Sequence, residues 1–133
     1  VNMYKSIEEA NIVETDFGVE FELCFTRHVI ERASERMGLS SEDAKGILLD
    51  YFDIPDVHDL IFAGVSTSEL KNGLDFVLCI KEYEMLVGCF VKRFANGIVI
   101  VTKTCLPKHA KARDGERTFF IKECNERGEY SFA

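Results

Sequence analysis

The sequence predicts an α+β protein in which N-terminal helices pack on an antiparallel sheet of four to five strands. Two capped helical segments are expected between residues 26 and 54. Apolar runs within residues 74–106 predict strands, and the dipeptide Asn96-Gly97 between two of them is typical of a tight hairpin turn. Helical segments therefore precede most of the predicted strands, which favours separate helical and sheet regions over alternating β-α-β units.

The start of the chain is predicted to hold a polar arm and one strand. Residues 1–16 are polar, and we expect a short helix or a loose arm there. In residues 19–25, apolar side chains alternate with Glu20, Glu22 and Cys24. A period of two indicates a strand that is buried on one face only.

Two helices are expected next. Thr26 can cap a helix that runs to about Met37, and Gly38 can end it in the left-handed conformation. A second helix should begin at Ser40 and end before Pro55. Its predicted core residues are Ala44, Ile47, Leu48 and Tyr51. The mixed apolar stretch that follows, residues 57–65, fits either a helical turn or a short strand.

The second half of the chain is predicted to form the sheet. Lys81–Glu84 would connect the first two strands tightly, and the Asn96-Gly97 turn would connect the next two. Strands are expected at residues 74–80, 85–94 and 98–106, with candidate edge strands at residues 118–122 and 130–132.

Length and composition indicate one domain that spans residues 1–133, with 47% hydrophobic and 29% charged residues. No apolar run approaches the ~18–20 residues that cross a bilayer. The N-terminal residues lack the apolar segment of a signal peptide. We therefore expect a cytoplasmic protein without membrane contact. The five cysteines form no Cys-x-x-Cys pair, so we expect reduced thiols and no metal site.

The charge is unevenly distributed. Residues 1–60 hold 14 acids against 5 Lys/Arg, a net of −9, whereas residues 61–133 hold 9 acids against 11 Lys/Arg, a net of +2. Within the second half, residues 92–117 hold seven Lys/Arg and two acids. This basic segment could bind phosphate groups, and the acidic half could instead bind a basic protein partner.

The first candidate site is a histidine–arginine row on the first predicted helix. His28, Arg32 and Arg36 recur every four residues, which places them on one stripe beside an apolar stripe that faces the sheet. Guanidinium groups match phosphate oxygens, and histidine can move a proton near neutral pH. The alternative interpretation is a solvated helix face on which Glu31 and Glu35 pair with the arginines.

Further candidate substrate-binding residues lie on the last apolar strands and the loop after them. Lys92 and Arg93 are strand neighbours, so only one of them can face a shared cleft. The basic loop after the most apolar strand could hold an RNA backbone, or it could be an ordinary solvated loop. The candidates that this region adds are Lys103, Lys108, His109 and Lys111. His58 lies between two acids and is interpreted as a surface residue.

Two segments carry a resemblance to a known family. The run from His28 to Arg36 resembles a His-Leu-Leu-x-Arg-Ala-x-x-Arg run of the phage RegB endoribonucleases, which belong to the RelE/ParE-like superfamily of small ribonucleases and toxins. Residues 98–113 resemble the same family in their apolar strand, polar turn into Leu-Pro, and tail rich in Lys and Ala. One departure is that the family's second important histidine, on the second helix, has no counterpart at residues 47–50. His58 or His109 could take its place in space.

The resemblance implies a RelE-like fold and a metal-independent endoribonuclease that acts on free or ribosome-bound RNA without a cofactor. His28 would be its general acid or base, and Arg32 and Arg36 would stabilise charge on the phosphate, with help from Lys103 or Lys108. The alternative is a non-catalytic acidic protein of the same fold that binds or inhibits a host protein.

Overall fold

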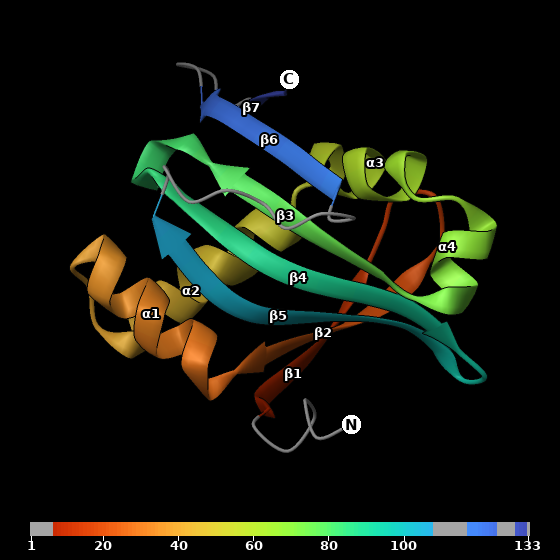
Figure 1. The fold of residues 1–133 in the computed structure, drawn as a ribbon, viewed down its shortest axis with the longest axis horizontal. Coiled ribbons are helices and arrows are strands. Elements are labelled where there is room, and N and C mark those ends of the chain that lie inside the picture. Colours follow the sequence, from red (N-terminus) through yellow and green to blue (C-terminus); the bar gives the residue numbers. More distant parts are fainter. Residues whose placement is uncertain (1–6, 108–116, 125–129, 133) are drawn as a thin grey trace.

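A computed structural model of the protein describes residues 7–107, 117–124 and 130–132. A mixed sheet of seven strands, in the order β1-β2-β5-β4-β3-β6-β7, runs through this part of the chain, and four helices pack against it (Figure 1). The strands are β1 (Ile7–Glu14), β2 (Glu20–Thr26), β3 (Leu74–Ile80), β4 (Met85–Phe94), β5 (Gly97–Pro107), β6 (Arg117–Cys124) and β7 (Tyr130–Phe132). The helices are α1 (Arg27–Met37), α2 (Ser41–Phe52), α3 (Pro55–Gly64) and α4 (Thr67–Asn72), with a 3-10 turn η2 (Lys81–Tyr83).

The predicted α+β class is confirmed, but the helices are not N-terminal. Two paired strands, β1 and β2, precede them, and the polar segment predicted as an arm or helix forms β1. Glu8, Ala10, Ile12 and Glu14 on β1 are exposed, whereas Val13 is buried in the core. A strand at the edge of a sheet can carry polar residues on its outer face, so its composition hides the strand from sequence reasoning.

The prediction of an antiparallel sheet is wrong, because β2 pairs with β5 and β3 pairs with β6 in parallel. The reason lies in the crossover. The chain leaves β2, passes through all four helices and enters β3 in the direction of β2, and the β3-β4-β5 meander then brings β5 beside β2. Parallel neighbours need a connection of this kind. The hairpin between β4 and β5 is confirmed, but its turn residues are Ala95 and Asn96, because Gly97 already pairs with Phe94 as the first residue of β5.

The predicted ends of the first two helices are confirmed by their caps. The Thr26 hydroxyl oxygen accepts a hydrogen bond from Val29 N at 3.1 Å, and Gly38 ends α1 with φ 68°. Ser40 accepts from Asp43 N at 3.2 Å and starts α2. The ambiguous stretch after α2 is a helix, α3, which begins with Pro55 in its first turn.

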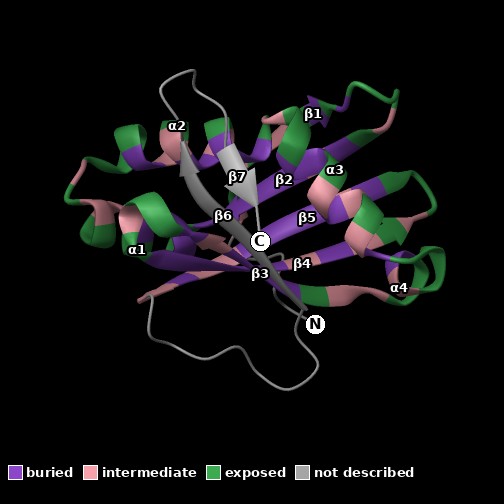
Figure 2. Ribbon diagram, turned by 90° about the horizontal axis from the view of Figure 1, so that it is seen from above, coloured by how far each residue is buried: buried purple, intermediate pink, exposed green. Residues whose placement is uncertain are grey.

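The core lies between the helices and one face of the sheet. Alternate strand residues, such as Phe76, Leu78 and Ile80 on β3, are buried there in the same core cluster as Val29 of α1 and Leu48 of α2. Figure 2 shows buried segments along the central strands and exposed segments on the outer sides of the helices. Among the helices that the structure describes, none is long and apolar enough to cross a bilayer.

Candidate functional site

The predicted histidine–arginine row lies on the solvent side of α1. His28, Arg32 and Arg36 are all exposed, whereas Val29 and Ala33 on the adjoining stripe are buried. Because residues 27–37 are helical, the spacing of four residues places the three side chains in one row. We call these three residues the α1 row.

Helix α1, which carries the row, borders the C-terminal half of β5. The Thr26 hydroxyl lies 3.1 Å from the carbonyl oxygen of Thr102 and 3.2 Å from that of Lys103, so it can donate to either. Further along, Cys105 Sγ lies 3.9 Å from the Val29 carbonyl oxygen. Burial raises the pKa of Cys105 to about 12, and the nearby Arg36 charge opposes that rise. The two segments that carry the family resemblance therefore meet at α1 and β5.

Part of the α1 row is already neutralised. Arg32 pairs with Glu35 at 3.0 Å, and Arg27, beside the row, pairs with Glu31 at 3.2 Å and lies 3.6 Å from Glu8. These pairs match the solvated-face alternative from the sequence. They are exposed, and an exposed ion pair contributes only about 0–1 kcal/mol, so a phosphate group can compete for Arg32. Within the described residues, His28 and Arg36 have no ion-pair partner.

The strand cations are not gathered beside the α1 row. Lys103 Nζ lies 2.6 Å from Asp75 Oδ1, on the sheet face that points away from the helices. Lys92 points to that same face, where its Nζ lies 5.3 Å from the centroid of the Phe94 ring. Arg93 is exposed and, as the strand neighbour of Lys92, points to the other face. The binding roles of these three residues remain predictions, and Lys108, His109 and Lys111 lie outside the described residues.

His58 was predicted at the surface, and that prediction is wrong. Its side chain is 2% exposed, and Nε2 lies 2.6 Å from the Phe52 carbonyl oxygen. The ring meets Phe21 edge-on at 5.5 Å between centroids. Nδ1 is buried and has no hydrogen-bond partner among the described residues. A ring packed in this way cannot reach RNA, so it does not replace the family's second histidine.

The thiols and acids make no metal site in the described part of the chain. Cys24, Cys79, Cys89 and Cys105 are thiols that form no disulfide with one another, and no group of three or more His, Cys, Asp or Glu residues there could hold a metal ion. Burial is the largest cause that raises the pKa of Cys24 to about 12, followed by the neighbouring Glu22 charge. Burial also raises the pKa of Cys79 to about 11. These thiols are poor nucleophiles because the thiolate is the reactive form.

The acidic residues of β1 and β2 form a feature that sequence reasoning identified only as net charge. Residues 7–26 contain no Lys or Arg, and their six acids are Glu8, Glu9, Glu14, Asp16, Glu20 and Glu22. Glu14 stands directly opposite Glu20 in the antiparallel pair. Sequence reasoning did not predict β1 as a strand, so it could not predict the register that brings Glu14 opposite Glu20.

Comparison of the chain with models of known protein families, with curated proteins and with solved structures finds no match.

Proposed function

We propose that the protein is a metal-independent endoribonuclease of RelE-like fold, most similar to the RegB family, that binds RNA along the α1 row. The observation that carries the proposal is one exposed row of an imidazole and two guanidinium groups, His28, Arg32 and Arg36. The order strand, helices and antiparallel meander supports the fold assignment. The β1 strand is additional to what the resemblance predicts, and the parallel β2–β5 and β3–β6 pairs depart from the antiparallel sheet that it implies.

RNA carries its own nucleophile, the 2′-hydroxyl beside each phosphodiester. When this oxygen attacks phosphorus, it loses a proton, the bond to the 5′-oxygen breaks, and that oxygen gains a proton. The products are a 2′,3′-cyclic phosphate and a 5′-hydroxyl. In the proposal His28 performs one of the two proton transfers, and Arg32 and Arg36 stabilise the charge on the phosphoryl oxygens. His109 is the sequence candidate for the second transfer.

The test is incubation of the protein with total RNA and, separately, with translating ribosomes. We expect fragments with 5′-hydroxyl ends, and we expect His28→Ala to slow their appearance by about 10²–10⁴-fold, the usual loss for a general acid or base. Lys71→Ala on α4 is a matched control, because it also removes an exposed cation, at the other end of the sheet (Figure 1). Equal cleavage by wild type and His28→Ala would contradict the assignment of His28.

A second candidate function is binding of a basic protein partner through the acidic N-terminal half. The specific observation that favours it is the concentration of carboxylates on β1 and β2 without any Lys or Arg in residues 7–26. Long-range attraction between opposite charges would speed such association, and added salt would slow it. This function does not require cleavage of RNA.

A further inference from the structure

The β1 strand is an edge of the sheet in the described part of the chain. In the described sheet it pairs with β2 on one side only, over Ile7–Glu14. The main-chain N–H and C=O groups on the other side of an edge strand can pair with an added strand. Natural edges are commonly protected by lysine, proline or a bulge, and β1 contains neither lysine nor proline. Its one irregularity lies at its start, between Ile7 and Glu9.

The side chains along this edge select the charge of the added strand. Glu8, Ala10, Ile12 and Glu14 form the exposed row of β1. A second copy of the chain would bring two such rows of carboxylates together, which opposes pairing between copies. A strand with lysine or arginine at alternate positions would instead place cations beside Glu8 and Glu14.

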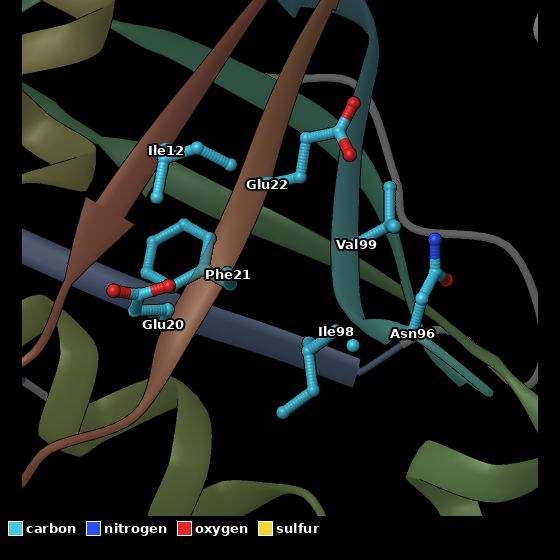
Figure 3. A pocket seen from close by; sticks show the side chains of 8 residues that line it. Ile12, Glu20, Phe21, Glu22, Asn96, Ile98 and Val99 are labelled. Atoms are coloured by element: carbon cyan, nitrogen blue, oxygen red, sulfur yellow. The ribbon is translucent and has the colours of Figure 1, made fainter.

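A hollow lies on the β2 side of Ile12, over β2 and β5, so that only the end of a long side chain extending across Ile12 from the added strand would enter it (Figure 3). It has a volume of about 90 Å³, opens to solvent, and is lined by Ile12, Glu20, Phe21, Glu22, Asn96, Gly97, Ile98 and Val99. Ile12 is 68% exposed and adds apolar surface at the rim of the hollow. Apolar groups at Ile12 and Val99 therefore lie next to the carboxylates of Glu20 and Glu22.

This combination matches the two parts of a lysine or arginine side chain. The aliphatic stem packs on apolar surface while the charged end reaches polar groups. Glu14 and Glu20 face each other across the strand pair, and like charges in that position destabilise a sheet. Within the described residues, Glu14, Glu20 and Glu22 have no ion-pair partner, so a ligand cation would relieve their repulsion.

We propose that β1 binds an extended, cationic segment of a partner protein as an added strand, with the end of one lysine or arginine side chain of that segment in the hollow beside Ile12. This inference deepens the second candidate function and is independent of RNA cleavage. Main-chain hydrogen bonds along β1 would provide affinity, and the carboxylates would provide selectivity for basic sequences.

The experiment uses the whole ¹⁵N-labelled protein and three synthetic peptides. One alternates lysine with valine, the second has glutamate in place of each lysine, and the third is the lysine peptide N-methylated at alternate residues, which removes the donors that pair with β1. We expect the lysine peptide alone to shift the amide signals of Ile12, Glu20 and Glu22 and to slow hydrogen exchange along β1. Equal binding of the methylated peptide, shifts spread over the whole surface, or no binding would each overturn the proposal.

Two double variants test the site itself. Glu20→Gln with Glu22→Gln should weaken the lysine peptide by roughly five- to tenfold, the effect of losing two exposed ion pairs. Asp43→Asn with Asp50→Asn removes the same charge from exposed positions of α2 and should change affinity by less than about twofold. Equal losses in both would mean that net charge alone attracts the peptide. A dimer formed through β1 in sedimentation would assign the edge to a second copy instead, and RNA cleavage by the first double variant tests the other function separately.

Discussion

His28 and His58 differ in the properties that decide whether an imidazole can react with a bound molecule. His28 is exposed at the start of α1, whereas His58 is enclosed by the core and bonded to the Phe52 carbonyl. The helical phase explains the difference, because His58 lies on the same side of α3 as the buried Ile61. Its acidic neighbours in the sequence, Asp56 and Asp59, misled the sequence interpretation because they point the other way.

Replacement of the two histidines should therefore have opposite consequences. His58→Ala should lower the free energy of unfolding by about 2–4 kcal/mol, because it leaves a cavity and an unpaired Phe52 carbonyl. His28→Ala should change it by no more than about 0.5 kcal/mol, as at other exposed positions. Urea denaturation measures both, and His58→Gln is the control that keeps a donor for the carbonyl. A stable His58→Ala protein would contradict this role of His58.

Glu35 is expected to compete with RNA for Arg32. Glu35→Gln removes the carboxylate that lies 3.0 Å from Arg32 and leaves the helix sequence otherwise unchanged. RNA affinity should rise about two- to fivefold at low salt, and the gain should shrink as salt screens the charges. Filter binding with a single-stranded RNA across a salt series measures this, and Glu42→Gln on α2 is the matched control. Equal gains in both variants would show that only net charge matters.

The buried thiols lead to a prediction about alkaline pH. The pKa is raised to about 12 for Cys24 and Cys105 and to about 11 for Cys79, against 9.0 for an unperturbed thiol. A raised pKa in the folded state means that the unfolded protein loses the thiol protons first as the pH rises. The free energy of unfolding that these thiols contribute is therefore fully present below pH 9 and is lost as the pH rises toward 11–12. At pH 8 these three thiols should react with iodoacetamide far more slowly in the folded than in the urea-denatured protein, as measured by peptide mass spectrometry. Equal rates in the two states would contradict the burial of Cys24 and Cys105 and the partial burial of Cys79.

At the scale of elements, Thr26 links the end of β2, the start of α1 and the middle of β5. Its hydroxyl accepts from Val29 N and can donate to the carbonyl oxygen of Thr102 or Lys103. Thr26→Ala should lower the free energy of unfolding by about 1–2 kcal/mol, because it removes the helix cap and takes a hydrogen-bond partner from buried main-chain groups. Thr26→Ser should retain most of it. Thermal unfolding compares the two variants, and equal losses would show that the methyl group, not the hydroxyl, is what matters.

The elements that local sequence determines were predictable, and those that depend on distant partners were not. Caps at Thr26 and Ser40, the stop at Gly38 and the turn at Asn96 act within a few residues, so helix ends and the hairpin follow from short segments. The parallel β2–β5 pair joins segments separated by the four helices, and β1 is a strand only because it pairs with β2. Neither pairing leaves a local pattern in the sequence.

The candidate site was predictable to the same extent. The spacing of the α1 row follows from helix geometry, and exposure of all three residues agrees with it. Strand alternation from the core residues Ile98 and Ile100 puts Lys103 on the face away from the helices, where its ammonium group lies beside Asp75. A register shift in the β4–β5 pair, between Gly88 and Cys89, then changes the phase of β5 and returns Cys105 to the core, which alternation alone does not predict.

At the scale of the molecule, two surfaces of opposite charge lie close together. The α1 row belongs to a helix whose first residue, Arg27, lies 3.6 Å from Glu8 of the acidic β1 edge. A polyanion approaching α1 would be repelled by that edge, so its binding should be strongly dependent on salt and on contacts beyond the row. A cationic protein segment would instead be attracted by the β1 edge and repelled by the arginines of α1. The same charge distribution thus separates the two proposed ligands onto neighbouring surfaces.

The central claim is that the α1 row cuts RNA, and its most direct test is a parallel measurement of cleavage rate and thermal melting for wild type, His28→Ala and Arg32→Ala. We predict melting temperatures within about 2 °C of wild type, since all changes are at exposed positions. We predict a loss of about 10²–10⁴-fold in cleavage rate for His28→Ala, and a combined loss of rate and RNA affinity for Arg32→Ala. Cleavage by folded His28→Ala at the wild-type rate, or no cleavage by wild type on free RNA or ribosomes, would contradict the account.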